Sequence, residues 1–561
     1  MRFALAFGLL NTLLTFENRW PGFGVLYMPR LSFELCLGVA ALLGWVAWRG
    51  RPPGTRALSW LAVGFVWLVL VRYADVTIPA VLGRPVNIYW DGQHAAELMR
   101  VAARSLSLVQ LGAVVSGCIA GLVVLWAVVR WALGTLSQAL LWSAPRPWLL
   151  GAVAALTVSF AAYVPDQRDT RWFFSLPLMP TLVDQGVLLA RVAWAHSDAA
   201  VLGPSPTFGG SLAGLAGPQG SRDVLLVFAE SYGAVAFDRP DMAEALVDAR
   251  SQLAQTIAFG GRQVVSARVV APTFGGSSWL SHATLLSGVN TADPSHHQLL
   301  LASDRPTLVG HFAQQGYRTV GWMPGIKRPW PEGRFYGFDR FVDDAGMGYQ
   351  GPDFGYWRIP DQAAMALLHA QELAVQDAES DRAPRLVVFP TTTTHAPFHP
   401  VAPLESDWSG LMDGSVPAPA QAQAALAQSL ELQNPVRNYL SSMQYQYGWW
   451  NAYLRDLAPR PLVVVIVGDH QPPGLVAGNG ASWDVPVHII ADDPALIRRL
   501  LAQGFTPGLG LPATPLGPME QLTRQLLLAF EHDPRDGTLP DPSLADSTEP
   551  VDGSEASTPD T

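Results

Sequence analysis

Charged side chains, cysteines and lysines are all scarce in this sequence. Only 15% of the 561 residues are charged, whereas soluble globular proteins carry about 25%, so a wholly soluble protein is disfavoured. Basic residues number 36 and acidic residues 46, a balance that excludes a nucleic-acid-binding protein. The two cysteines, Cys36 and Cys118, lie in strongly apolar stretches, which rules out a disulfide framework or a CxxC metal site.

The negative charge is concentrated at the end of the chain. From Glu531 onward there are nine acidic residues and one basic residue, Arg535, which account for −8 of the formal net charge of −10. Residues 533–561 are also rich in Pro, Ser, Thr, Asp and Gly, so we expect a disordered acidic tail there. The rest of the chain is close to neutral, and Lys327 is its only lysine.

Long apolar runs dominate residues 1–165. About 20 apolar residues cross the hydrocarbon core of a bilayer. The first run, at 3–16, is shorter than this, but no small-residue cleavage pattern follows it, so we expect an uncleaved first helix and not a signal peptide. The other runs approach or exceed the spanning length and lie at 31–48, 57–73, 108–133 and 148–164. The sequence therefore predicts an N-terminal bundle of about five transmembrane helices.

The arginines of the short loops predict the orientation of this bundle. Arg49, Arg51 and Arg56 lie between the second and third spans, and Arg130 and Arg146 bracket the loop between the fourth and fifth. Excess arginine marks the cytoplasmic side. We therefore expect a multi-pass protein of the cytoplasmic membrane, an interfacial linker over 166–215, and everything beyond it on the extracytoplasmic side.

From about residue 216 short β-rich runs alternate with helical stretches. Near-continuous apolar strands separated by helices are typical of a mostly parallel sheet with both faces covered, so we predict one α/β domain over 216–532. Strands are expected at 223–229, 264–270, 317–322, 385–390, 461–468 and 485–491, and helices at 242–258, 307–315, 361–375 and 445–457.

Five of these strands carry reactive side chains after their carboxyl ends, which is where open α/β sheets place their sites. Each signal alone is weak, since a strand-end Glu is more often a turn residue, and serines near a helix start are ordinary N-caps. Their joint occurrence indicates a metal site beside a nucleophile. In chain order these residues are Glu230, Ser278, Lys327, Arg328, His395, Asp469 and His470.

The chemistry of this set is consistent. Glu230, Asp469 and His470 supply two carboxylates and an imidazole, which suit a divalent cation such as Mn²⁺ or Zn²⁺. Such a cation would lower the pKa of the Ser278 hydroxyl and make it nucleophilic at neutral pH. A helix N-terminus below that hydroxyl favours a bound phosphate. The basic groups of Lys327, Arg328 and His395 could neutralise phosphate oxygens during transfer.

With these residues in place, the sequence resembles the sulfatase-like branch of the alkaline phosphatase superfamily. It is most similar to membrane-anchored lipoteichoic acid synthases and to related phosphoglycerol and phosphoethanolamine transferases, over about residues 220–495. The resemblance implies an alkaline phosphatase/sulfatase-like α/β sandwich, and it places the nucleophile ten residues before Gly288, at Ser278. It also implies metal ligation by Glu230, Ser278, Asp469 and His470. The substrate-binding residues that we expect are His395, Lys327, Arg328, Trp330 and His282.

The nucleophile motif departs from the family pattern. The synthases and phosphoethanolamine transferases use threonine as nucleophile, whereas this chain has Ser278. The adjacent Ser277 is the alternative nucleophile, which would shift the register of the motif by one residue. The residues directly after Ser278 include neither the Pro nor the Arg of a sulfatase motif, which disfavours ordinary sulfatase activity.

The expected headgroup site departs from the family as well. In the family an arginine follows the tryptophan that Trp330 resembles, and Glu332 replaces that arginine in this chain. Lys327, Arg328 or Arg334 could compensate for the missing positive charge.

Together these features predict an extracytoplasmic, metal-dependent transferase of a phospholipid headgroup that acts through a phospho-serine intermediate. The expected donor is a membrane phospholipid, and the expected acceptor is a glycan, a glycolipid or water. Two alternatives stay open at this point. One is a sulfatase-like hydrolase of sulfuric esters or phosphodiesters, and the other is a membrane sensor or assembly factor that has lost catalysis.

Overall fold

The computed structural model describes most of residues 2–531. The longer stretches outside the described residues are 89–107, most of 142–173, 195–201, 375–381, 415–418, 429–433 and 532–561, with a few shorter ones such as 328–329. The predicted acidic tail at 533–561 and most of the predicted fifth span at 148–164 therefore lie outside the described residues.

The N-terminal part consists of apolar helices at the positions of the first four predicted spans. Two described helices are long and apolar enough to cross a membrane, over Thr55–Val81 and Val109–Ala139, and a shorter apolar helix covers Arg2–Thr15. The helices of this part are α1 (Arg2–Thr15), α2 (Phe33–Arg49), α3 (Thr55–Leu82), α5 (Leu108–Ala139) and α7 (Leu178–Trp194), with a small hairpin of β1 (Glu17–Asn18) and β2 (Val25–Leu26).

One eight-stranded sheet forms the centre of the α/β domain, in the order β12-β6-β11-β10-β5-β9-β7-β8. Neighbouring pairs from β10 through β5, β9 and β7 to β8 are parallel, whereas β11 is antiparallel to both β10 and β6. The prediction of a mostly parallel sheet is confirmed. The strands are β5 (Val224–Ala229), β6 (Gln263–Val270), β7 (Arg318–Met323), β8 (Arg340–Asp343), β9 (Arg385–Pro390), β10 (Val463–Gly468), β11 (Asp484–Ala491) and β12 (Thr506–Pro507).

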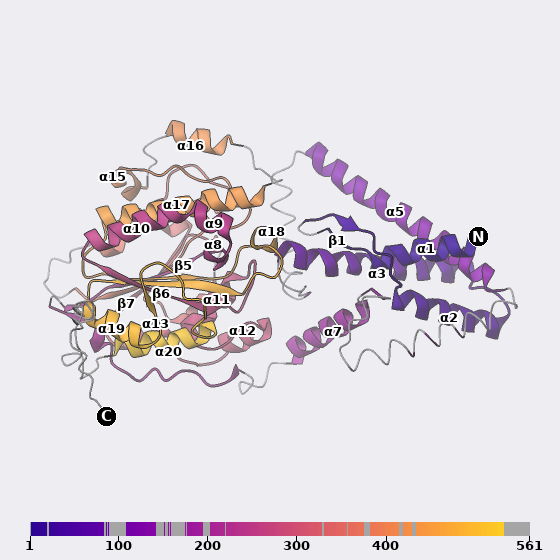
Figure 1. The fold of residues 1–561 in the computed structure, drawn as a ribbon, viewed down its shortest axis with the longest axis horizontal. Coiled ribbons are helices and arrows are strands. Elements are labelled where there is room, and N and C mark those ends of the chain that lie inside the picture. The colour runs from indigo at the N-terminus through magenta and orange to yellow at the C-terminus, as the bar shows by residue number, and fades with distance from the viewer. Residues whose placement is uncertain are drawn as a thin grey trace, which may run out of the picture.

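Helices cover both faces of this sheet (Figure 1). One face packs against α10 (Val247–Phe259), α14 (Asp361–Leu368) and α17 (Pro435–Asp456), and the other against α11 (Ser278–Ser287), α13 (Leu308–Gln314), α19 (Pro494–Ala502) and α20 (Met519–Phe530). Each face buries its own apolar cluster. The central strands are apolar throughout because both of their faces are covered, and all six residues of β5 are buried.

Two helix predictions differ from the structure at their ends. The helix expected at 445–457 begins ten residues earlier, at Pro435, where the Asn434 side chain accepts a hydrogen bond from the Arg437 amide. The helix expected at 361–375 is α-helical only to Leu368 and continues as a π-turn over His369–Leu373. The remaining short α-helices are α8 (Val235–Asp238), α9 (Pro240–Ala245), α12 (Pro294–Leu301), α15 (Trp408–Met412), α16 (Pro419–Leu426) and α18 (Gly474–Ala477). A small hairpin of β3 (Ala216–Gly217) and β4 (Gly220–Ser221) and 3₁₀ turns at Ala213–Leu215, Pro331–Tyr336 and Ala345–Met347 are the other short elements described.

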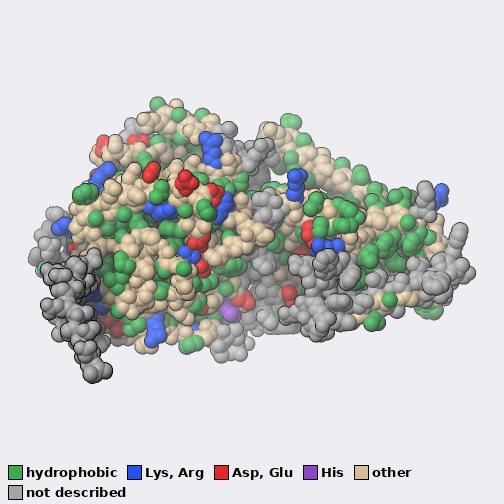
Figure 2. All heavy atoms as spheres, in the orientation of Figure 1, with side chains coloured by type: hydrophobic (Ala, Val, Ile, Leu, Met, Phe, Trp, Pro, Cys, Tyr) green, Lys and Arg blue, Asp and Glu red, His purple; other side chains and the backbone are tan. Residues whose placement is uncertain are grey.

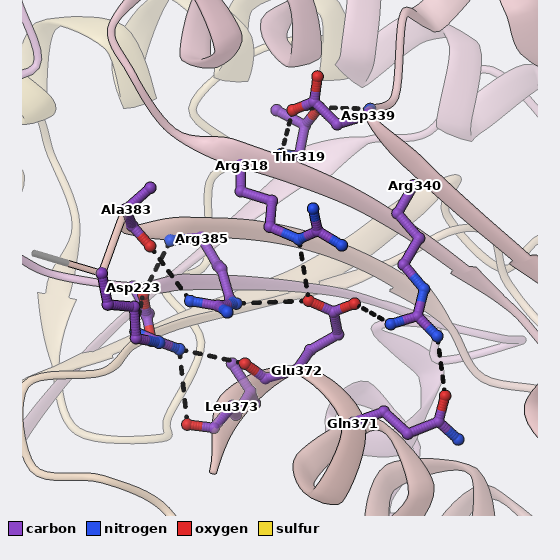
Figure 3. A network of polar contacts seen from close by, with 11 residues as sticks. Asp223, Arg318, Thr319, Asp339, Arg340, Gln371, Glu372, Leu373, Ala383 and Arg385 are labelled. Carbon is purple, nitrogen blue, oxygen red and sulfur yellow. Dashed lines mark hydrogen bonds and ion pairs between the residues drawn. The ribbon is translucent and has the colours of Figure 1, made fainter. Parts of the chain in front are cut away.

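A buried ion network closes the amino-terminal edge of the sheet (Figure 3). The Glu372 carboxylate, which is 1% exposed, pairs with Arg318, Arg340 and Arg385 from the starts of β7, β8 and β9. Burial by itself raises the pKa of Glu372, but the neighbouring arginines outweigh burial and the net shift is downward. The π-turn at His369–Leu373 carries Glu372, so this turn and three strands are held by one carboxylate.

The α/β domain meets the N-terminal helices through α18, which contacts α3. Figure 1 shows α18 beside the end of α3 that points toward the α/β domain. On the face drawn in Figure 2, hydrophobic side chains gather over the N-terminal helices, and charged side chains are concentrated on the α/β domain. At 28 residues, α3 is about 42 Å long and exceeds the hydrocarbon thickness of about 30 Å.

We expect Glu372→Gln to lower the free energy of unfolding by about 3 kcal/mol, because it leaves the buried Arg385 guanidinium without its charged partner. The measurement is denaturant unfolding of the full chain in detergent, followed by near-ultraviolet circular dichroism. Since the pKa of Glu372 is lowered in the fold, the difference is complete above the ordinary glutamate pKa of about 4.3. It is lost as the pH falls through the lowered pKa of the folded state.

The control for this prediction is Asp456→Asn at the exposed Arg455 pair. This variant should change the free energy of unfolding by less than about 1 kcal/mol, because solvent screens the pair. Equal effects of the two variants would contradict a stabilising role of the network.

Candidate active site and metal centre

The sheet topology brings the strand-end residues to one edge. β6, β7, β9, β10 and β5 all run in the same direction, because β6 and β10 are each antiparallel to β11 and the other three are parallel to β10 or to its neighbours. Their carboxyl ends therefore lie on one side of the sheet. Glu230 follows β5 directly and Asp469 follows β10 directly, and these two strands are adjacent.

A strained turn presents Ser278 at the first position of α11. Gly275 and Gly276 have positive φ angles of 66° and 146°, and Ser277 is in the left-handed region at φ 66°. A non-glycine residue in that region costs about 1–3 kcal/mol and is often found at functional sites. The helix ends at Gly288, with φ 65°, as the sequence indicates. The turn thus places the Ser278 side chain above the helix N-terminus.

The Ser278 hydroxyl lies between two of the predicted ligands. Its Oγ donates a hydrogen bond to Glu230 Oε2 at 2.8 Å and lies 3.1 Å from His470 Nε2. Ser277, the alternative nucleophile, forms the N-cap position and makes no side-chain capping hydrogen bond. The structure therefore places the Ser278 hydroxyl against the predicted ligands, and the choice between the two serines as nucleophile stays a prediction.

Glu230, Asp469 and His470 form a buried cluster in which one ligand atom of each lies within 4.8 Å of the others. His470 Nε2 is 3.4 Å from Glu230 Oε1 and 3.8 Å from Asp469 Oδ1. Burial lowers the pKa of His470, but the two carboxylates outweigh burial and raise it to about 9. Burial and the Glu230 charge raise the pKa of Asp469 well above its usual range, whereas the His470 charge overcomes burial and holds the pKa of Glu230 below its usual range.

The residues of this cluster fit a divalent cation. Asp469 Oδ1 accepts hydrogen bonds from the Ser231 and His470 amides, but the buried Asp469 Oδ2 has no hydrogen-bond partner among the described residues. Two buried carboxylates side by side are costly unless positive charge compensates them. Carboxylate oxygens and an imidazole are donors that Mn²⁺ and Zn²⁺ accept.

His282 lies behind this cluster, one turn along α11 from Ser278. Its Nε2 is 3.9 Å from Asp469 Oδ2, and its ring packs on Phe228 with centroids 4.3 Å apart. Burial lowers the pKa of His282 to about 4. The structure therefore brings His282 to Asp469, and its predicted contact with substrate stays a prediction.

Sequence reasoning missed the side chains that hold the cluster in place. Thr391 Oγ1 accepts the Glu230 amide hydrogen, and Thr394 Oγ1 donates to the Glu230 carbonyl. Ser281 Oγ donates to the Asp469 carbonyl at 2.6 Å. The run of four threonines before His395 was the one available signal, because strand-end hydroxyls are well placed to bond a neighbouring strand end.

The predicted substrate-binding residues are distributed unevenly around this edge. His395 is among the groups that lower the pKa of Glu230, and its ring lies 5.0 Å from that of Trp357. Lys327 is exposed, with Nζ 5.8 Å from the centroid of the Trp357 ring. No sequence pattern had pointed to Trp357.

For the other two predicted substrate-binding residues, the described part of the chain shows no ring contact with this group. The ring contacts of Trp330 are with Tyr336 and Phe341, at 5.7 and 5.5 Å. Arg328 lies outside the described residues. The predicted contacts of both residues with substrate stay predictions.

Comparison with known proteins gives structural likeness only. No family model matches the chain, and no curated protein matches it. Among solved structures, the chain is similar to a protein of the alkaline phosphatase superfamily from Vibrio parahaemolyticus, at 14% identity over 63% of this chain and 78% of that chain, with a TM-score of 0.36. It is also similar to the lipoteichoic acid synthase LtaP from Listeria monocytogenes, at 10% identity over 56% and 72% of the two chains, with a TM-score of 0.36.

A third similar structure is the C-terminal periplasmic domain of EcEptC from Escherichia coli, at 15% identity over 49% of this chain and 75% of that domain, with a TM-score of 0.31. These are the groups of proteins that the motifs of the sequence resemble. At such identities and scores the likeness concerns the fold, and function is inferred from the site geometry described above.

We expect Asp469→Asn to weaken Mn²⁺ and Zn²⁺ binding at least tenfold, because it replaces one of the two carboxylates of the cluster with an uncharged amide. The measurement is isothermal titration of the full chain in detergent after chelation and dialysis. Asp407→Asn, at an exposed helix cap, is the matched control and should bind the metal as the native protein does. Unchanged affinity in Asp469→Asn would show that the cation binds elsewhere.

Proposed function

We propose that this protein is an extracytoplasmic, metal-dependent transferase of a phospholipid headgroup, either phosphoglycerol or phosphoethanolamine, with Ser278 as nucleophile. One observation carries the proposal. The Ser278 hydroxyl stands at a helix N-terminus and is hydrogen-bonded to Glu230 within a buried cluster of Glu230, Asp469 and His470. This is the arrangement that an activated hydroxyl beside a bound phosphate requires.

In the first step Ser278 Oγ attacks the phosphorus of the lipid phosphodiester. The Oγ–P bond forms, the P–O bond to diacylglycerol breaks, and the leaving oxygen takes up a proton. Ser278 Oγ already donates its hydrogen to Glu230 Oε2, so an acceptor for that proton is in place. The N-terminus of α11 stabilises the negative charge of the phosphate oxygens. Lys327 supplies positive charge at the same edge of the sheet, and His395 supplies an imidazole that can hydrogen-bond to a phosphate oxygen.

In the second step an acceptor hydroxyl from a glycan, a glycolipid or water attacks the same phosphorus. The Ser278 Oγ–P bond breaks, the serine regains a proton, and the headgroup phosphate is transferred to the acceptor. With water as acceptor the same site acts as a hydrolase.

Glu230, Asp469 and His470 would hold the cation, Mn²⁺ or Zn²⁺, with Ser278 Oγ as a further ligand. When bound, such a cation lowers the pKa of the hydroxyl and compensates the charge of the phosphate. The buried Asp469 Oδ2, which has no hydrogen-bond partner among the described residues, supports this assignment.

A lipid donor fits the placement of the domain. The loop that carries Asp469 and His470 leads directly into α18, and α18 contacts α3. We propose that the apolar helices anchor the chain in the cytoplasmic membrane with the α/β domain outside the cytoplasm. The donor could then react without leaving the bilayer.

We expect the native protein to form a covalent adduct between Ser278 and the headgroup phosphate. Ser278→Ala should abolish this adduct, because it removes the attacking oxygen, and Ser277→Ala should keep it. The measurement is mass spectrometry of the full chain after incubation with phosphatidylglycerol or phosphatidylethanolamine vesicles and Mn²⁺. An adduct that survives in Ser278→Ala and is lost in Ser277→Ala would shift the nucleophile by one residue. If the native protein formed no adduct but released sulfate from an aryl sulfate, the sulfatase alternative would replace this proposal.

A further inference from the structure

Three buried polar side chains on one face of α17 lie behind the turn that carries Glu230. They belong to Tyr439, Gln446 and Tyr447, which share a face because they are about two helical turns apart. Burying a polar group is unfavourable unless the group is hydrogen-bonded. The partners of these side chains therefore indicate why the helix carries polar residues at positions that could be apolar.

The first two side chains reach the main chain on either side of Glu230. The Tyr439 hydroxyl donates to the Ser231 carbonyl at 3.0 Å. Gln446 Nε2 donates to Thr391 Oγ1 at 3.3 Å, and the same oxygen accepts the Glu230 amide hydrogen at 3.0 Å. One helix thus holds the peptide groups before and after the Glu230 side chain.

The third side chain fixes the next residue of the turn. The hydroxyls of Tyr447 and Tyr232 lie 2.6 Å apart, and the Tyr232 hydroxyl also lies 2.9 Å from His488 Nε2. His488 Nδ1 is in turn 2.6 Å from Ser266 Oγ. This chain of hydrogen bonds ties Tyr232 to α17, β11 and β6, so the turn cannot shift without breaking it.

The turn must be held because Ser231 contacts both carboxylates of the cluster. Its amide donates to Asp469 Oδ1 at 2.8 Å, and its Oγ donates to Glu230 Oε1 at 3.1 Å. Ser231 does this at φ 54°, a conformation that persists only when the surrounding structure fixes it. The backbone conformation of Ser231 therefore sets the direction of both carboxylates.

We propose that Tyr439 and Gln446 are positioning residues for the divalent cation. They hold the Glu230–Ser231 turn in the conformation that directs the oxygens of Glu230 and Asp469 to one point. This inference rests on the proposed function, because it takes the buried cluster of carboxylates and imidazole as the cation site. Tyr439 acts through the Ser231 carbonyl, and Gln446 acts through the threonine hydroxyl that receives the Glu230 amide.

The first test compares two tyrosines of α17 by isothermal titration of Mn²⁺ and Zn²⁺ into the full chain in detergent, after chelation and dialysis. Tyr439→Phe should weaken both cations about tenfold, as is usual when a group that orients a metal ligand is lost. Tyr453→Phe is the matched control, because this buried hydroxyl lies 3.5 Å from His369 Nδ1, in the turn that closes the opposite edge of the sheet. It should leave both affinities within twofold.

The thermal transition of each variant is measured alongside. Both substitutions remove one buried hydroxyl, so a loss of stability is expected in both. A loss of cation affinity at a temperature well below the transition is expected in Tyr439→Phe alone.

The second test separates hydrogen bonding from packing at Thr391. Thr391→Val keeps the volume and removes the hydroxyl, whereas Thr391→Ser keeps the hydroxyl and removes a methyl group. Valine should weaken Mn²⁺ about tenfold, and serine should stay within threefold of the native protein. Gln446→Met should also weaken Mn²⁺, and it should add little to Thr391→Val, because both act through the same oxygen.

Three results would overturn the inference: native affinity in Tyr439→Phe, an equal loss of affinity in Tyr453→Phe, or weaker binding in Thr391→Ser than in Thr391→Val. Failure of the proposed function is recognised separately. If the cation affinities followed these expectations and no adduct formed at Ser278, the transferase would be refuted and the positioning role kept. If the adduct formed and Tyr439→Phe bound the cations as the native protein does, the reverse would hold. A native chain that bound neither cation would refute both the positioning role and the metal dependence.

Discussion

The hydrogen bond from Ser278 to Glu230 is the interaction on which the rest of the site depends. It joins the start of α11 to the end of β5, and His470 at the end of β10 approaches the same oxygen. Because Glu230 and Asp469 are both buried, their charges must be compensated locally. Without a cation, the compensation comes from His470, whose pKa is raised to about 9 by its acidic neighbours. A divalent cation would supply the same compensation and activate the hydroxyl.

Backbone strain accompanies both halves of this interaction. Ser231 follows Glu230 and Ser277 precedes Ser278, and both serines have left-handed φ angles. Each conformation is unfavourable for a residue with a Cβ. Hydrogen bonds hold Ser231 in place, since its amide donates to Asp469 Oδ1 and its carbonyl accepts from the Tyr439 hydroxyl. The strain therefore occurs where two strands and one helix must deliver their side chains to one point.

The two edges of the sheet have different electrostatics. At the amino-terminal edge, Glu372 is surrounded by arginines and its charge is fully compensated within the protein. At the carboxyl edge, two carboxylates share one histidine, and one carboxylate oxygen has no hydrogen-bond partner among the described residues. The first arrangement is suited to stability, and the second is suited to binding a cation. Contact between α18 and α3 places the second edge next to the N-terminal apolar helices.

The sequence by itself determined the apolar helices, the α/β alternation, and the strand-end positions of Glu230, Asp469 and His470, because hydropathy and periodicity are local properties of the chain. It could not decide between the serines at 277 and 278, since the choice depends on a turn whose φ angles are set by packing. It pointed to Trp357 by no pattern, and to the threonines that hold Glu230 only by their run before His395, because the contacts of these residues join segments far apart in the chain. Tertiary structure decided that Ser278 Oγ lies against Glu230 and which side chains surround it, since only the folded sheet brings the ends of separate strands within hydrogen-bonding distance.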